Sequence, residues 1–226
     1  MREFFDTWWS LEPIVQLLVP ILLFAHRLPR RPHAALRGAG VLLALLFIAV
    51  VPLATGLVRG LDVLQTFIVF SALLAFFVGA ILLVYRVSLW TALFCATAGY
   101  TLQNIASGLT ILTQMLITGR ASAALSEPLA SIVAVGVPAL VYLLGYIFFA
   151  RSVALNGLLN VENRLMLSMF AIVVIVVIGF DLIIKGLTFV GIPFNYLLLL
   201  RCVHPLVCVF VLFAEYELLY AKHAED

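Results

Sequence analysis

The segment from Asn195 to Tyr220 reads NYLLLLRCVHPLVCVFVLFAEYELLY, a long apolar run that contains Arg201 and His204. Its length predicts a membrane-spanning helix, which needs about 20 apolar residues. A central Arg costs about 2.5 to 3.5 kcal/mol on membrane insertion, so such groups usually face a partner in a helical bundle or a water-filled cavity. This segment is therefore the first place to look for function.

The composition indicates that the whole chain is an integral membrane protein. Of its 226 residues, 65% are hydrophobic and only 11% are charged, which is too little polar surface for a soluble domain of this size. The apolar runs have helix length and lack the alternation of outer-membrane strands, so an all-α bundle is predicted. The three cysteines lie within apolar runs, which favours packing roles over a disulfide framework or a metal site.

The distribution of basic residues predicts the topology. The densest cationic patch lies between residues 26 and 37, HRLPRRPHAALR. The positive-inside rule places this loop in the cytoplasm and the N-terminus outside. Alternation then gives seven spans with a cytoplasmic C-terminus, so residues 1–214 form a seven-span transmembrane domain and residues 215–226 begin a cytoplasmic helix. After a first span that ends near residue 25, the spans cover about 38–58, 63–85, 89–117, 129–150, 165–184 and 195–214.

The fourth predicted span carries a stripe of polar side chains. Its members follow the i, i+3, i+4, i+7 spacing that places residues on one helix face. The stripe consists of Tyr100, Gln103, Asn104 and Ser107, and Thr97 and Gln114 extend it. Two interpretations are open. The face forms hydrogen bonds between helices, each contributing about 0.6 to 2 kcal/mol, or it senses a ligand or transmits a signal.

The seventh predicted span has a similar stripe. Arg201, His204 and Cys208 share one face, which continues to Glu215 at the predicted cytoplasmic exit. Pro205 removes one backbone donor, so it should bend or weaken the helix beside His204.

Arg201 has two possible relations to Asp181 of the sixth span. A long Arg side chain reaches toward the outer surface, so an ion pair between Asp181 and Arg201 is geometrically feasible. Lys185 competes for the same carboxylate because it lies four residues further along the same helix. Both pairings can hold at once.

His204 also has two interpretations. A neutral histidine would hydrogen-bond to a polar neighbour such as Gln103 or Asn104, whereas a histidine that titrates near neutral pH would act as a pH sensor. The sequence alone leaves both open.

Several chemistries find no support in the sequence. There is no HExxH, CxxC, phosphate-binding glycine loop or nucleophile motif at a usable spacing. A retinal protein would need a lysine in the last span, where Arg201 is the cation present. The single small basic loop offers no nucleic-acid surface. We therefore predict no catalytic, cofactor-binding or metal-binding residue in this chain.

The polar exit after residue 214 reads EYELLYAKHAED. Val209, Leu212, Tyr216 and Leu219 alternate spacings of three and four, the pattern of an a/d seam. This pattern predicts a dimerising helix, and a simple amphipathic tail fits the same spacing equally well.

Two stretches together resemble a known family. YTLQNIASGL (residues 100–109) and RCVHPLVCVFVLFAEYELLY (residues 201–220) resemble the N-terminal sensor region of GHKL-type sensor histidine kinases, related in plan to accessory-gene-regulator quorum-sensing receptors. The resemblance implies a multi-pass homodimer in the bacterial cytoplasmic membrane with an extracellular ligand, for example a peptide. It also implies a following kinase domain that uses ATP and Mg²⁺ and phosphorylates a cytoplasmic response regulator.

The chain departs from that family at its C-terminal end. The sequence stops at Asp226, and His223 lies in the context AKHAED, which does not match the phospho-acceptor box. We expect either a fragment or a receptor without a kinase, and kinase activity only if a kinase domain follows. The predicted function is a two-component signal receptor whose last span relays a signal inward. The alternatives are a small-molecule transporter or permease, although no inverted repeat is visible, and a structural membrane partner.

Overall fold

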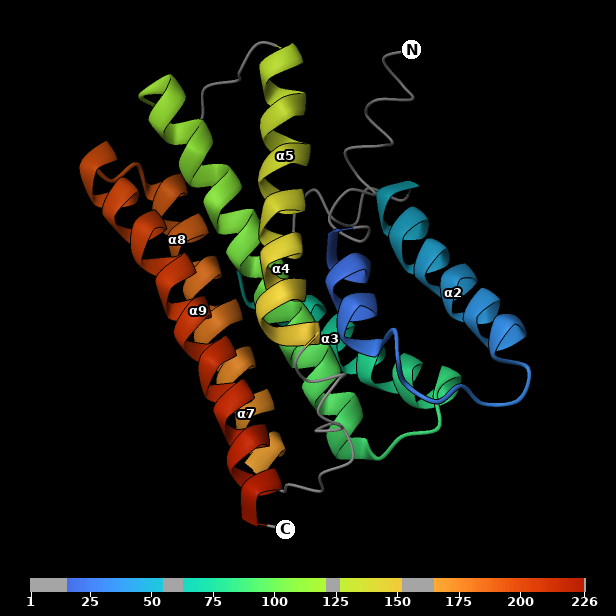
Figure 1. Cartoon of the computed structure of the whole chain (residues 1–226). Coiled ribbons are helices and arrows are strands. Elements are labelled where there is room, and N and C mark those ends of the chain that lie inside the picture. Colours follow the sequence, from blue (N-terminus) through green and yellow to red (C-terminus); the bar gives the residue numbers. More distant parts are fainter. Residues whose placement is uncertain (1–15, 55–62, 121–126, 152–164, 226) are drawn as a thin grey trace.

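The structure is a computed structural model that describes residues 16–54, 63–120, 127–151 and 165–225. These residues form seven helical rods, which confirms the all-α prediction (Figure 1). The rods are the helix Gln16–Ala25, α2 (Ala34–Ala54), α3 (Val63–Val84), α4 (Leu89–Thr118), α5 (Glu127–Gly145) continued by the π-helical turn η2 (Tyr146–Ala150), α7 (Leu165–Ile172) continued by the π-helical segment η4 (Val173–Ile178) and by α8 (Gly179–Val190), and α9 (Phe194–Glu225).

The observed helix limits agree with most of the predicted ones, and the sixth rod is the main exception. It continues to Val190 rather than ending near residue 184. Thr188 donates its hydroxyl to the carbonyl of Ile184 at 2.8 Å, so this polar residue is satisfied within the helix. The helix ends where Gly191 adopts a left-handed conformation with φ of 78°. The start of the first predicted span, the end of the second and Asp226 lie outside the described residues.

Within the described part of the chain, four helices are long and apolar enough to cross a membrane. They cover Phe67–Val84, Pro128–Ala150, Leu165–Thr188 and Phe194–Tyr220, and Gln16–Ala25 and Ala34–Ile48 are shorter apolar helices. These helices indicate a membrane protein. The count of seven spans and the sidedness of the chain stay predictions.

α4 is the central helix, and it is not among those four apolar helices. It is buried along most of its length and packs against α9, α5 and α3 (Figure 1). Small residues permit this close packing. A Cβ added to Gly99 would lie 2.8 Å from the Cα of Ile21, and one added to Gly145 of α5 would lie 2.5 Å from the Cδ2 of Leu102. The bundle is therefore built around a helix that is less apolar than its neighbours α3 and α5.

The connection after the first helix is hydrogen-bonded to the end of α3. Arg31 donates its backbone N–H to the carbonyl of Val84 at 3.0 Å, and Arg86 donates to the carbonyl of Pro29 at 2.7 Å. The Arg37 guanidinium also donates to the carbonyl of Leu83. Two connections that the sequence predicts to be cytoplasmic thus meet at one end of the bundle.

Candidate functional site

Asp181 of α8 lies between two basic side chains. Its Oδ1 accepts a hydrogen bond from Nη1 of Arg201 on α9 at 3.0 Å, and its Oδ2 lies 2.6 Å from Nζ of Lys185. Both pairings predicted from the sequence are therefore present. The Arg201 side chain is 7% exposed, whereas that of Lys185 is 42% exposed. The pair between helices is shielded, and the cluster carries one more positive than negative charge.

Lys185 extends the cluster to a third helix. Its Nζ lies 5.4 Å from the ring centroid of Phe70 on α3, within the range of a cation–π contact. The charged cluster, defined as Asp181, Lys185 and Arg201, thus joins α8 to α9 and touches α3.

His204 lies one turn along α9 from Arg201 and is almost fully buried. Its Nε2 lies 3.6 Å from Sγ of Cys208, and its ring meets that of Phe180 edge-on with centroids 5.7 Å apart. Its Nδ1 has no hydrogen-bond partner among the described residues. The ring also interacts with the backbone of Val177 in η4. His204 is therefore enclosed mainly by α8, η4 and its own helix.

The predicted hydrogen bond from His204 to Gln103 or Asn104 is wrong. Asn104 donates its Nδ2 to the backbone carbonyl of Tyr100 at 3.0 Å and to Oε1 of Gln103 at 3.2 Å. Its amide group is thus satisfied within α4. The α4 residue that meets His204 is Gly108, which has no side chain to offer.

At Gly108, α4 lies close to the proline turn of α9. A Cβ added to Gly108 would lie 2.9 Å from Cγ of Pro205 and 3.2 Å from Nδ1 of His204. α9 continues as one helix through Pro205. Because proline has no N–H, the backbone carbonyl of Arg201 lacks its usual helical donor. The helix thus has one hydrogen bond fewer beside the charged cluster, and the predicted bending or weakening at Pro205 stays a prediction.

The polar stripe of α4 lies partly inside the bundle. Tyr100 and Asn104 are buried, whereas Gln103 and Ser107 are half-buried. Tyr100 interacts electrostatically with Asp181 and Cys208, so the α4 stripe and the α9 stripe meet across one interface. No described contact shows a ligand role for Ser107.

Sequence reasoning missed the position of Glu215, which it places at a polar exit. Glu215 is completely buried, and neither carboxylate oxygen has a hydrogen-bond partner among the described residues. Thr97 of α4 faces it. The hydroxyl of Thr101, one turn away on α4, is also buried without a partner. The shared helical face of Cys208 and Glu215 is the signal that could have indicated burial.

The predicted a/d seam of the exit helix does not form a free surface. Leu212 and Leu219 are buried in the core of their own bundle, and Tyr216 packs against it. The ring of Phe149 in η2 lies 5.7 Å from that of Tyr216. The seam spacing therefore reflects packing within the chain, because α9 stays against the bundle beyond residue 214.

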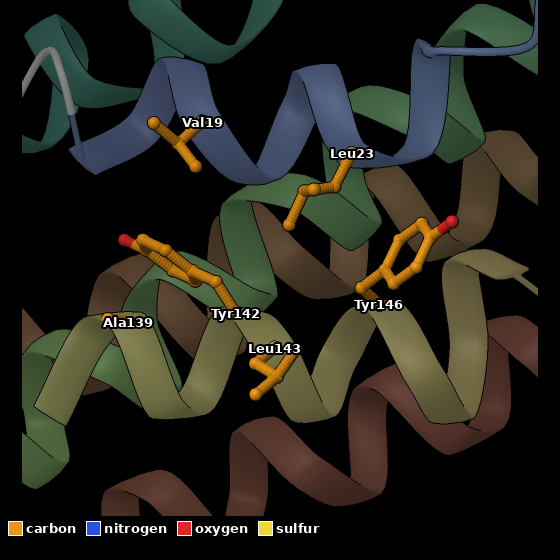
Figure 2. A pocket seen from close by; sticks show the side chains of 6 residues that line it. All are labelled: Val19, Leu23, Ala139, Tyr142, Leu143 and Tyr146. Atoms are coloured by element: carbon orange, nitrogen blue, oxygen red, sulfur yellow. The ribbon is translucent and has the colours of Figure 1, made fainter.

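An apolar groove lies between the helix Gln16–Ala25 and α5. Its volume is about 400 Å³, and Figure 2 shows side chains of both helices along it. Tyr142 donates its hydroxyl to the carbonyl of Gln16 at 2.7 Å, and the ring of Tyr146 lies 5.7 Å from that of His26. The lining residues are Val19, Leu23, Ala139, Tyr142, Leu143 and Tyr146.

One wall of this groove is connected to α9 through η2. Tyr146 belongs to the same π-helical turn as Phe149. Phe149 packs against α9, with its ring 5.0 Å from that of Phe213. π-helical turns are rare and often occur at functional sites. The turn that carries Tyr146 at the groove therefore also contacts α9.

The chain was compared with family models, curated proteins and solved structures. No family model, no curated protein and no solved structure matches it.

Proposed function

We propose that this chain is the sensor part of a membrane signal receptor, in which α9 relays a signal from the charged cluster to the C-terminal end. The observation that carries this proposal is the α4–α9 interface. It is the most extensive contact between described helices, and it is lined by polar side chains rather than by apolar ones alone. A single helix, α9, carries both Arg201 and Glu215.

A polar interface suits a helix that changes position. Apolar packing of complementary shapes favours one arrangement strongly, whereas hydrogen bonds and ion pairs can exchange partners between two arrangements. A ligand would shift α9 only if it bound one of these arrangements more tightly than the other. Asp181 already has two basic partners, so an anionic ligand group near Lys185 would compete with the carboxylate for them.

The topology predicted from the sequence fits this function. In the proposed receptor, the N-terminus and the charged cluster face the outside of a bacterial cytoplasmic membrane, and the end of α9 faces the cytoplasm. In Figure 1 the connection from the first helix to α2 and the connection from α3 to α4 lie toward the same end of the bundle as the C-terminus, which is compatible with the positive-inside rule. The proposed output is a histidine kinase of the GHKL type, working as a homodimer on a response regulator.

The reading frame beyond the codon for Asp226 gives the first test. A histidine box followed by an ATP-binding domain would support the kinase output, and a transport domain would contradict it. In membranes that contain the full-length protein, the second test measures autophosphorylation with ATP. We expect Arg201→Ala to change the basal rate, while Lys185→Ala changes it less. Equal rates in the wild type and in folded Arg201→Ala would contradict the relay role.

A transporter is the second candidate, because ionisable side chains follow one face of α9. Arg201, His204, Cys208 and Glu215 are all buried. Such a row is also typical of a proton path through a membrane. A vesicle reconstituted with the purified chain and loaded with a pH-sensitive dye would test this. Proton entry that depends on Glu215 would favour the transporter over the receptor.

A further inference from the structure

Glu215 is a buried group at the far end of the proposed relay, and the relay assigns no chemistry to its carboxyl group. Its side chain is fully enclosed, and both carboxylate oxygens lack a hydrogen-bond partner among the described residues. An ionised carboxylate buried without a partner is strongly unfavourable, and in proteins such a group is normally neutralised. The structure therefore raises the question of what neutralises Glu215.

Thr97 answers part of that question. It faces Glu215 across the α4–α9 interface. Its hydroxyl hydrogen is directed to its own helix, since Oγ1 lies 2.9 Å from the carbonyl of Leu93 and 3.2 Å from that of Phe94. A hydroxyl has one hydrogen and two lone pairs, so Thr97 has only lone pairs left for its neighbour. A carboxylate also has only lone pairs, whereas a carboxylic acid has the missing hydrogen.

The other groups around Glu215 supply no positive charge. α7, with the sequence LMLSMFAI, has no titratable side chain. On the remaining elements near it, the titratable side chains that the structure describes are Cys95 and Tyr100 of α4, Tyr146 of η2, and Cys208, Tyr216, Glu217 and Tyr220 of α9, while the side chains of Lys222 and His223 lie outside the described residues. None of these is a cation, and both Glu217 and Arg151, the basic residue that follows η2, are exposed. Within the described part of the chain, a proton is the neutralising partner that fits the geometry.

We propose that Glu215 is a proton-binding site in the α4–α9 interface. When α9 is packed on α4, the side chain is the neutral acid, and its O–H donates to Oγ1 of Thr97. Release of the proton to water leaves a negative charge with no donor, so this half of the interface loosens. The proton therefore acts as a ligand of the packed arrangement. This inference does not depend on the proposed receptor function.

Infrared difference spectroscopy of the purified chain in lipid vesicles tests the site. The C=O stretch of a carboxylic acid lies apart from amide and carboxylate bands. We expect wild-type protein to show this band at neutral pH and to lose it as the pH is raised. Glu215→Gln should lack the band at neutral pH, where exposed carboxyl groups are ionised, whereas the exposed control Glu217→Gln should keep it. A wild-type spectrum without the band, or a band that survives Glu215→Gln, would overturn the proposal.

Thr97→Val tests the proposed hydrogen bond from Glu215 to Thr97. This test is informative even if the Glu215→Gln protein does not fold. We expect the C=O band to shift in frequency, because the acid loses its acceptor. Isotope labelling of the glutamate carboxyl carbon confirms that the band belongs to a glutamate. Thr110→Val is the matched control, since Thr110 is a buried α4 threonine that also donates to its own helix, at 2.8 Å to the carbonyl of Ala106. A band that Thr97→Val leaves in place, or that both variants shift equally, would refute the Thr97 contact.

Discussion

Buried ionisable groups at the two ends of the polar face of α9 have different surroundings. Near its start, Arg201 is paired with Asp181, which also contacts Lys185. Near its finish, Glu215 is more deeply buried and has no hydrogen-bond partner among the described residues. One end is fixed by charge, and in our proposal the other is fixed by a proton. The difference suggests that the start of α9 is an anchor and that its finish is adjustable.

Removing the charge of Asp181 should have the largest effect. Asp181→Asn leaves Arg201 buried without its carboxylate, which typically costs about 3 to 5 kcal/mol of stability. Denaturant or thermal unfolding in detergent micelles measures the loss. The double variant Asp181→Asn/Arg201→Gln removes both charges and should recover part of it. An Asp181→Asn protein as stable as the wild type would show that the anchor contributes little.

A substitution at Gly108, where α4 contacts α9 between its two ends, should have the next largest effect on stability. Gly108→Ala places a methyl group 2.9 Å from Pro205 and 3.2 Å from His204, so one helix must shift. Overpacking of this kind costs about 1 to 3 kcal/mol. Gly136→Ala on α5 is the control, because its added Cβ meets nothing within 4 Å and should stabilise the helix by about 0.5 to 1 kcal/mol. Equal effects at both sites would mean that α4 and α9 tolerate separation at Gly108.

Lys185→Ala tests whether the exposed Lys185–Asp181 pair contributes less to stability than the buried Arg201–Asp181 pair. Its side chain is 42% exposed and pairs with Asp181 along the same helix, so solvent screens the interaction. Lys185→Ala should therefore cost only about 0.2 to 1 kcal/mol in the same unfolding assay. A loss as large as that of Asp181→Asn would move the anchor from the α8–α9 contact to α8 alone.

Glu215→Gln should have the smallest effect. If the acid is already neutral, the amide changes neither the charge nor the shape much, and the free energy of unfolding should change by less than about 0.5 kcal/mol. The matched substitution Asp181→Asn is the reference. A Glu215→Gln loss of similar size to that reference would mean that Glu215 is ionised and has a charged partner in a segment that the structure does not describe.

The sequence predicts much of the fold because the signals are local. Long apolar runs determine the helices, and the four-residue spacing brings Lys185 to Asp181. The Arg201 pair is predictable as well, because a buried guanidinium needs a carboxylate and Asp181 is available at a matching depth. Each of these arguments needs one helix or two neighbouring helices only.

The remaining features depend on how several helices pack. Glu215 follows Ala214 at the polar end of an apolar run, and only the position of α4 shows that it is buried. The surroundings of His204 depend on Gly108, where no side chain reaches across. The π-helical segments YIFFA and VVIVVI have no distinguishing sequence pattern. Such features follow from packing rather than from periodicity.

Spin labels at the two ends of the α4–α9 interface measure the central difference directly. One pair of exposed label sites, near the anchor, is Leu116 and Leu199. The other pair, toward the Glu215 end, is Leu89 and Tyr220. The exposed Cys202 is replaced by Ser so that it takes no label, while the buried cysteines stay. Each pair is changed to cysteine, labelled and reconstituted in lipid vesicles, and pulsed electron paramagnetic resonance gives its distance distribution as the pH is raised.

Protonation stabilises the packed arrangement, so that stabilisation is present at low pH and is lost as the pH rises. We predict that the Leu89–Tyr220 distance then lengthens while the Leu116–Leu199 distance stays constant. With Glu215→Gln, neither distance should change. Constant distances at both ends of the wild type, or equal lengthening at both ends, would contradict the division of α9 into a charge-fixed anchor and a proton-dependent finish.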